Sequence, residues 1–538
     1  MTIDMNIFKY FAAGIIALAL FVSAPIVQAA ETESIQVQFN NSCAADVREE
    51  FNHAVTLLHS FEYVQTIHLF NEISERDPGC AMAHWGAAMS IWHPLWNPPS
   101  EAELEAGALH LAATNDLDMT PREAAYIDAL KTFFSSTDRS THLVRARAFG
   151  DKMADVYATN LDDPEATVFY ALALLAGADP RDKSYTRQYK SAALLNWVQS
   201  SQPTHPGVLH YLIHSYDYPG LAHLALSSAK TYADAAPDSA HAQHMPSHIF
   251  TRMGLWERSL SSNHDSTRSA AEFTVSAGLP GHYDEGLHSI DYLMYAMLQS
   301  ARDDEAKELL VRLGNITKTD TENFKVAYTY AAAPARYTLE RRQWEEAAKL
   351  EYVRKNFAWD DFGWAKSIHF FARGLGAARS GDLHQAREEL QVIRKLQSEM
   401  SANEIPYFRE EMQVQIDSLN AWILFSEGDT AGGLALASGA ADREDAVDKH
   451  PVTPGEVLPA RELYADMLRA AGQYAAALEN YLIVLKGSPN RLNALIGVAH
   501  AAAESGNKTL ASSYRQKIQA QTASGNGSRR SVLELGSR

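Results

Sequence analysis

Apolar residues recur every three or four positions through almost the whole chain, and strict alternation of apolar and polar residues is rare. This spacing is that of helices that bury one face, so the pattern predicts an all-α protein. Helical segments of about 12 to 16 residues are separated by pairs such as Gly-Asp and Asp-Pro, which end helices. We therefore expect many short helices joined by tight turns.

The C-terminal third contains an internal repeat. Gly472 and Gly506 are 34 residues apart, and so are Ala477 and Ala511. This period, with a glycine at the turn and a small residue where two helices cross, resembles the tetratricopeptide repeat. The same turn and small residue recur in SGDLHQA at 380–386, RRQWEEA at 341–347 and SARDDEA at 300–306. The resemblance implies a helix-turn-helix solenoid, a right-handed superhelix with inserted helices.

The chain divides into four predicted parts. Residues 1–30 read as a signal peptide, because Lys9 precedes an apolar run from Phe11 to Val22 and small residues end the segment at Ala30. We expect a helical repeat region with a histidine-rich concave groove over 31–310, further repeats over 311–521 and a disordered tail over 522–538. The leader predicts a periplasmic or secreted protein, and no later apolar run is long enough to span a membrane.

The chain has only two cysteines, Cys43 and Cys80. In an oxidising compartment they can pair and close a loop, which stabilises the fold by roughly 3 to 4 kcal/mol on the chain-entropy model. The alternative is two buried free thiols.

Charge narrows the classes of partner. The 538 residues include 66 acids and 47 lysines and arginines, which gives a formal net charge of −19. With no long basic block, the chain lacks the electrostatic footprint of a nucleic-acid binder. A peptide, a protein or a small molecule in the concave groove remains as the expected partner.

Histidines concentrate between His205 and His248 and follow the repeat. His210 and His244 are 34 residues apart, as are His214 and His248. His214 follows His210 by four positions, and His248 follows His244 by four. Two histidines at this spacing project from one face of a helix and can offer two ligands to one metal ion. We predict that these four histidines form a metal site; the alternatives are a polar peptide-binding groove and core packing.

Other polar residues fall near these four on the same register. Asp217 follows His214 by one turn, Asp291 takes the place of an imidazole in the next unit, and His288 precedes it, so these three complete the predicted ligand set. Nitrogen and oxygen ligands without thiolate suit Zn, Cu or Fe. Arg252 and Tyr295 are candidate catalytic groups.

Three more histidines are predicted to bind substrate. His241 lies one turn before His244, and His59 and His93 are 34 residues apart near several tryptophans. Because aromatic residues at helical spacing are more often core, packing is the competing interpretation of His59 and His93.

Pro246 lies between His244 and His248 and complicates the second pair. Inside a helix it would remove one backbone hydrogen bond and bend the helix. If a helix instead begins there, His244 falls in the preceding turn and the four-residue spacing no longer applies.

Four stretches, HSFEY, DPGCAMAHWGAAMSIWHPLW, HPGVLHYLIHSYDYP and HMPSHIFTRMGLW, resemble a group of exported bacterial tetratricopeptide-repeat proteins. The resemblance covers most of residues 43–310 and implies a groove that binds peptide or protein. It implies no reaction.

Two functions remain open. One is a metal-dependent enzyme, hydrolytic or oxidative, in which the ion polarises substrate or activates water or oxygen. The other is a non-enzymatic scaffold whose groove binds a peptide or protein partner.

Overall fold

The computed structural model describes residues 37–237, 239–401, 406–525, 529 and 532. Within them every regular element is a helix, and the β contact is an isolated bridge between His282 and Thr319. The predicted all-α class is confirmed. The described residues belong to one compact unit. The predicted signal peptide, residues 1–30, lies outside the described part of the chain.

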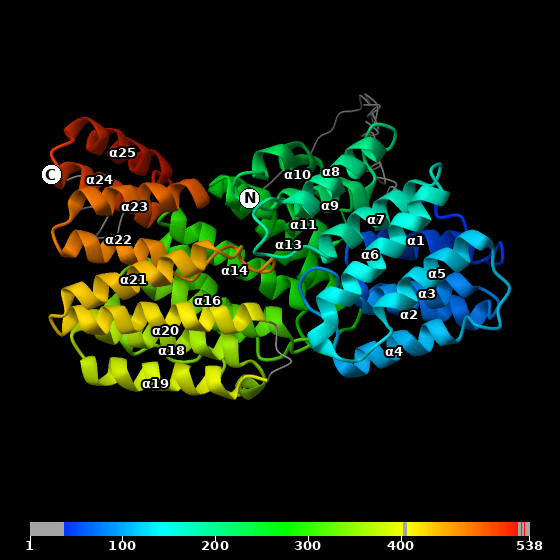
Figure 1. Cartoon of the computed structure of the whole chain (residues 1–538), viewed down its shortest axis with the longest axis horizontal. Helices are drawn as coiled ribbons and strands as arrows, with labels where there is room; N and C mark the ends of the chain where they lie inside the picture. The colour runs from blue at the N-terminus through cyan, green and yellow to red at the C-terminus, as the bar shows by residue number, and fades with distance from the viewer. Residues whose placement is uncertain (1–36, 238, 402–405, 526–528, 530–531, 533–538) are drawn as a thin grey trace, which may run out of the picture. The chain divides into compact units, whose positions relative to one another are not determined.

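The first half of the described chain consists of helices that mostly pack against the next helix in sequence (Figure 1). Their bounds are α1 Arg48–His59, α2 Tyr63–Arg76, α3 Ala81–Ile91, α4 Glu101–Ala112, α5 Pro121–Phe133, η1 Arg139–Thr141, α6 His142–Thr159, α7 Pro164–Ala176, α8 Thr186–Gln199, α9 Pro206–Tyr216, η2 Ala222–Ala225, α10 Leu226–Ala235, α11 Ala240–His244, α12 Pro246–Arg252 and α13 Trp256–Ser276.

The second half continues in the same way, with α20 packed on α21, α22 on α23 and α24 on α25 (Figure 1). The bounds are α14 Asp284–Gln299, α15 Asp303–Asn315, α16 Phe324–Glu340, α17 Trp344–Ala348, η3 Trp359–Asp361, α18 Gly363–Ser380, α19 Leu383–Glu399, α20 Pro406–Ser426, α21 Thr430–Asp445, α22 Ala460–Ala470, α23 Tyr474–Gly487, α24 Leu492–Glu504 and α25 Lys508–Gln521.

The turns between paired helices follow the predicted repeat. Gly472 joins α22 to α23 with φ 75°, and Gly506 joins α24 to α25 with φ 85°. In each turn the residue after the glycine donates its N–H to the carbonyl oxygen five residues back along the chain, which satisfies a free carbonyl at the helix end. Ala477 and Ala511 are buried. The chain is therefore a tetratricopeptide-like helix-turn-helix solenoid.

Three of these turns contain a residue other than glycine. Phe61 between α1 and α2, Ala301 between α14 and α15, and Arg342 between α16 and α17 have φ values of 56°, 55° and 56°. A left-handed backbone is unfavourable for residues with a side chain, by roughly 1 to 2 kcal/mol. Phe61 is the bulkiest apolar side chain of the three, so the fold holds it there against a local preference for glycine.

Two helices are enclosed on all sides. Every residue of α9 is buried, and so is every residue of α14. Helix α9 packs against α7, α8 and α10, and α14 packs against α13, α15 and α16. An enclosed helix has no solvent face, so its polar side chains need partners within the protein. The histidines of these two helices are therefore held by contacts.

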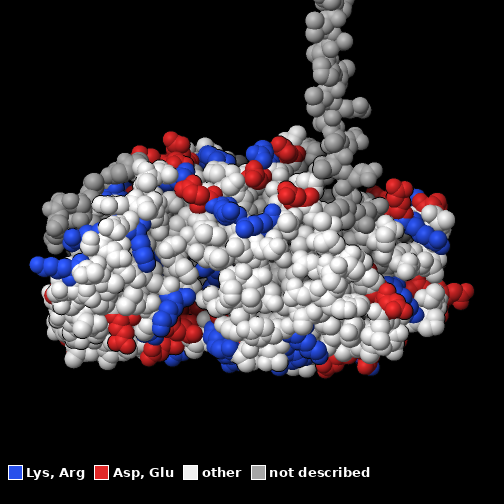
Figure 2. Space-filling view, turned by 90° about the horizontal axis from the view of Figure 1, so that it is seen from above, with Lys and Arg blue, Asp and Glu red and all other residues white. Residues whose placement is uncertain are grey.

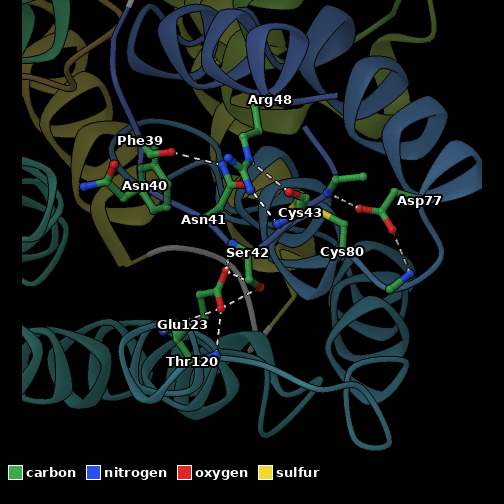
Figure 3. The surroundings of a disulfide bond; sticks show 12 residues. Phe39, Asn40, Asn41, Ser42, Cys43, Arg48, Asp77, Cys80, Thr120 and Glu123 are labelled. Atoms are coloured by element: carbon green, nitrogen blue, oxygen red, sulfur yellow. Dashed lines mark hydrogen bonds between the residues drawn. A yellow bond between two sulfur atoms is a disulfide. The ribbon is translucent and has the colours of Figure 1, made fainter. Parts of the chain in front are cut away.

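A disulfide between Cys43 and Cys80 fastens the segment before α1 to the start of α3 (Figure 3). Beside it, the Ser42 backbone N–H donates to the Glu123 carboxylate at 2.6 Å, and Glu123 also caps the start of α5 through Thr120. The closed loop and this cap tie three separate segments together at the beginning of the described chain.

The surface is mixed in charge where Figure 2 shows it. On that face lysines, arginines, aspartates and glutamates stand in small mixed groups separated by wide uncharged areas. Among the described residues, none of the helices combines the length and the apolar character that a membrane span requires. Of the predicted tail, residues 522–525 continue from α25 and the Arg529 guanidinium pairs with the Asp303 carboxylate; residues 526–528, 530–531 and 533–538 lie outside the described chain.

Candidate metal centre

Four helices bring six imidazoles together. Helix α9 carries His210 and His214, and α11 carries His241 and His244, while α12 contributes His248 and α14 contributes His288. All six side chains are buried, so they lie inside the packed helices and do not line an open groove. Helix α9 starts with Pro206, whose missing N–H is not needed there, and the His205 side chain caps it by accepting from the Val208 N–H at 3.3 Å.

The imidazoles form two groups of three. In the first, the Nε2 atom of His210 lies 3.0 Å from Nε2 of His214 and 3.2 Å from Nε2 of His241. Three nitrogens bound to one tetrahedral ion at about 2.0 to 2.1 Å would lie about 3.3 Å apart. The spacing of the first group is thus close to that of three ligands around one ion.

The second group consists of His244, His248 and His288. The Nε2 atoms of His244 and His248 are 3.0 Å apart, and the rings of His244 and His288 have centroids 4.1 Å apart. The groups adjoin each other, since the ring centroids of His214 and His248 are 6.0 Å apart. Each group of three could therefore hold a metal ion.

Hydrogen bonds to Nδ1 settle which nitrogen carries the proton in four of the rings. His210 Nδ1 donates to the backbone carbonyl oxygen of His59 at 2.6 Å. That oxygen has no proton to give, so in a neutral ring the proton is on Nδ1 and the Nε2 lone pair is free. His241 Nδ1 likewise donates to Glu285 Oε2 at 3.2 Å. The free lone pairs of His210 and His241 therefore face each other.

The second group repeats this arrangement. His244 Nδ1 donates to Asn263 Oδ1 at 2.6 Å, and the Asn263 amide is oriented by its own donation to the Ser259 carbonyl at 2.7 Å. His248 Nδ1 donates to Asp217 Oδ2 at 3.0 Å. Two Nε2 lone pairs then meet at 3.0 Å with no proton between them, so these two rings cannot hydrogen bond to each other in their neutral forms. A cation between them removes the repulsion.

Burial keeps five of the six rings neutral. It lowers the pKa of four of them well below the usual 6.5, and neighbouring imidazoles lower it further; the four are His210, His214, His244 and His288. Burial also lowers the pKa of His248 to about 4, despite the opposing effect of Asp217. Neutral imidazoles at pH 7 are the form that binds metal.

Carboxylates support the rings from outside. Asp217 accepts from Arg252 Nε at 2.9 Å and from Lys449 Nζ at 3.1 Å. Burial alone would raise the pKa of Asp217, but these two cations hold it well below its usual range. Glu285 pairs with Lys325 in the same way. Partners of this kind orient metal-bound imidazoles and raise their basicity.

Several residues singled out in the sequence lie elsewhere. Asp217 contacts a histidine from outside and does not join either group of three, and Asp291 instead pairs with Arg336 at 3.3 Å. The Arg252 guanidinium donates a hydrogen bond to the Asp217 carboxylate. The Tyr295 hydroxyl accepts from Arg491 at 3.2 Å.

The neighbouring Tyr292 comes nearer to the second group. Its hydroxyl lies 3.3 Å from Nδ1 of His248, and it donates to the Thr453 carbonyl oxygen at 3.1 Å.

His59 belongs to a separate closed network. Its Nε2 lies 2.8 Å from Glu165, which also accepts from His205 Nε2 at 2.7 Å, while its Nδ1 accepts from the Tyr211 hydroxyl at 3.0 Å. Since hydrogen bonds account for these ring nitrogens, no cation is needed there. His93 stacks on Trp96 with ring centroids 5.5 Å apart.

Proline does not disrupt the second group. Helix α11 ends at His244 and α12 begins at Pro246. Met245 between them keeps helical angles, φ −54° and ψ −36°, and its N–H donates to the His241 carbonyl at 2.9 Å. The backbone path therefore stays helical although the helix restarts, and His244 and His248 remain on one face.

Sequence reasoning missed four supporting residues: Glu285, Asn263, Tyr292 and Phe61. Glu285 lies three residues before His288, on the same face of α14, which was a readable signal. The other three meet the histidines through tertiary packing, for which the spacing gives no sign.

Comparison with known proteins gives no functional assignment. No family model matches the chain, and no curated protein matches it. Among solved structures, a human IFIT1 dimer with m7Gppp-AAAA has a TM-score of 0.37 and 14% identity over 82% of this chain and 90% of that one. The Cut9-Hcn1 hetero-tetramer of APC/C has a TM-score of 0.29 and 11% identity over 91% of this chain and 90% of that one. Scores this low support no conclusion about function.

Proposed function

We propose that this protein is a metal-dependent enzyme with a two-ion centre, in which His210, His214 and His241 hold one ion and His244, His248 and His288 hold the other. The observation that supports it best is the meeting of unprotonated Nε2 atoms, 3.0 Å apart for His244 and His248. Three protein ligands per ion leave a coordination position free, as catalytic sites do.

The ligand set favours copper. Six imidazoles without thiolate or carboxylate suit Cu, Zn, Fe or Ni and disfavour Mg, Ca and Mn, which prefer oxygen. Among divalent ions, nitrogen sites of this kind bind Cu²⁺ most strongly. A pair of redox-active ions with free positions directs the proposal to oxidative chemistry; zinc in the same site would direct it to hydrolysis.

Export is part of the proposal. The leader over residues 1–30 addresses the chain to the periplasm or the exterior, and the Cys43–Cys80 disulfide is a bond that persists in oxidising compartments. Fractionation of cells that express the full chain, with mass determination of the recovered protein, tests this: intact leader in the cytoplasmic fraction would contradict it.

Elemental analysis tests the centre itself. Untagged protein from copper-supplemented cells is expected to hold two ions per chain, His210→Ala or His248→Ala about one, and the double variant about none. His384→Ala, at an exposed position, is the matched control and should keep both ions. Helical circular dichroism of each variant separates loss of metal from loss of fold.

Two results would contradict the proposal. Wild-type protein without metal, unaffected by chelator, would favour a scaffold that binds a peptide or protein partner. Two ions retained by the folded double variant would place the metal elsewhere.

A further inference from the structure

A cavity of about 1120 Å³ lies beside the first group of histidines. Its walls come from segments far apart in the chain: Phe61 and Tyr63 near the start of α2, Trp96 in the loop after α3, Glu285 in α14, Phe324 at the start of α16 and Trp364 in α18. This volume suffices for a drug-sized molecule.

Phe61 separates the cavity from the imidazoles. Its ring centroid lies 4.4 Å from that of His210, 5.6 Å from that of His241 and 5.8 Å from that of His214. The same ring stacks on Tyr63 at 5.3 Å and lines the cavity. One side chain therefore touches all three ligands of the first group and the cavity together.

The backbone of Phe61 is held in an unfavourable conformation at this point. Its φ of 56° falls at the turn position that Gly472 and Gly506 occupy in other units, with the same hydrogen bonds across the turn. Glycine would relieve the strain, so the turn does not require the aromatic ring. Strained residues of this kind concentrate at functional sites, where the side chain has a role beyond the fold.

Glu285 makes a second connection. One Glu285 carboxylate oxygen accepts from His241 Nδ1 at 3.2 Å, and the other pairs with Lys325. Glu285 and Lys325 both line the cavity. A single side chain, Phe61 at one point and Glu285 at another, therefore connects the cavity to the first group.

The lining favours aromatic rings. Phe324 stacks on Trp364 with centroids 5.1 Å apart, and His93 stacks on Trp96 at 5.5 Å. The Lys325 ammonium lies 4.5 Å from the centre of the Trp96 ring, so this wall already accommodates a cation over an aromatic face.

Charge favours a cation over an anion. Seven carboxylates line the cavity against four basic side chains: Glu103, Asp284, Glu285, Glu322, Asp360, Asp361 and Glu399 against Arg139, Lys325, Lys366 and Lys395. A net negative lining attracts cations and repels anions.

We propose that this cavity is the substrate chamber of the histidine centre, that it takes a small aromatic amine, and that Phe61 is the wall between chamber and centre. That the amine is a substrate rests on the proposed function, whereas its binding to the cavity does not depend on bound metal.

Calorimetric titration of metal-free and metal-loaded protein with tyramine tests the chamber. We expect saturable binding in both forms, at least tenfold tighter than that of 3-(4-hydroxyphenyl)propionate, an anion of similar size. Trp96→Leu should weaken tyramine binding about tenfold and leave metal content unchanged. Trp197→Leu, which removes a tryptophan that is 58% exposed, is the matched control and should bind as the wild type does.

The outcomes separate the two proposals. Tyramine binding by a protein that takes up no metal supports the chamber and contradicts the two-ion centre. Two bound ions with no tyramine binding, or with equal binding of the anion, overturns the chamber alone.

The wall is tested by chelation kinetics. Phe61→Leu should speed removal of copper from the first group by a bulky chelator at least fivefold, whereas Phe324→Leu, which removes a lining ring that stacks on Trp364, should not. Equal rates in both variants would overturn the role of Phe61.

Discussion

The Nε2 atoms of His244 and His248 lie 3.0 Å apart across the start of a new helix at Pro246. Both Nδ1 atoms are occupied as donors, to Asn263 and Asp217 respectively. The contact is therefore unfavourable in the metal-free neutral state and becomes favourable with a cation between the rings. Its geometry depends on the short connection through Met245.

Pro246→Gly should weaken metal binding at the second group alone. Glycine adds backbone freedom at the first residue of α12, which the protein must then restrict when the ion binds. We expect an affinity loss of about fivefold to tenfold, equivalent to about 1 kcal/mol. Competition with a chelator of known affinity, following each ion separately, measures it.

The first group provides the comparison for this variant. Its ligands lie on α9 and α11, ahead of Pro246, so its affinity should stay within twofold of wild type. Equal weakening at both groups would show that the substitution disturbs the fold as a whole.

Asp217→Asn should weaken metal binding and also destabilise the protein. The carboxylate orients His248 and neutralises Arg252 and Lys449, which are both held in the interior. Removal of such a partner typically lowers metal affinity by about 10- to 100-fold. Leaving two cations without their carboxylate destabilises by roughly 3 to 5 kcal/mol.

Asp291→Asn is the matched control for Asp217→Asn. Asp291 is also buried and pairs with Arg336, but its described hydrogen bond and ion pair go to Arg336 and not to any of the six histidines. We expect a loss of stability in chemical denaturation, because Arg336 loses its carboxylate partner, and unchanged metal affinity. If the two variants lose affinity equally, the effect of Asp217 comes from general destabilisation.

The grouping of the histidines was readable from the sequence only in part. The 34-residue register relates His210 to His244 and His214 to His248, and the structure places these residues on neighbouring helices. The register could not divide them into two groups, because His241 and His288 complete the groups from a different turn and a different helix. The four-residue spacing paired His210 with His214 and His244 with His248, but it gave no sign of which third ring joins each pair.

Contacts between distant segments were beyond the sequence pattern. The His59 carbonyl that fixes the proton on His210 lies 151 residues away along the chain. It is free to accept because His59 ends α1, where carbonyls lack helical partners. The sequence showed His59 as a candidate side chain, whereas its backbone makes the contact with the first group.

Ala301→Gly should stabilise the protein. Ala301 has φ 55° at a turn where other units use glycine, so the substitution relieves an unfavourable backbone conformation. Loss of a buried methyl group opposes part of this gain. We expect a net stabilisation of about 0.5 to 1 kcal/mol, measured by thermal and chemical unfolding.

Ala435→Gly is the opposite case. Ala435 is exposed in the interior of α21, where glycine is about 1 kcal/mol less favourable than alanine. The same substitution should therefore stabilise at one site and destabilise at the other. Destabilisation at both sites would show that the turn at Ala301 is not strained.

The buried imidazole of His369 should make the protein sensitive to acid. Its ring stacks on Tyr352 with centroids 3.9 Å apart, and burial, with the nearby Arg373, lowers its pKa from 6.5 to about 4. The unfolded chain binds a proton below pH 6.5 that the folded chain does not, so the contribution of the neutral ring is fully present above pH 6.5. It is lost as the pH falls from 6.5 toward 4, by roughly 2 to 3 kcal/mol.

His369→Phe keeps the stacked ring and removes the titration. Chemical denaturation at pH 7 and pH 4.5 should show a smaller loss of unfolding free energy for this variant than for the wild type, by about 2 kcal/mol. His384→Phe, at a position 83% exposed, should lose as much as the wild type between the two pH values. An unchanged acid loss in His369→Phe would mean that other buried groups account for it, because a ring that no longer titrates cannot contribute to the difference between the two pH values.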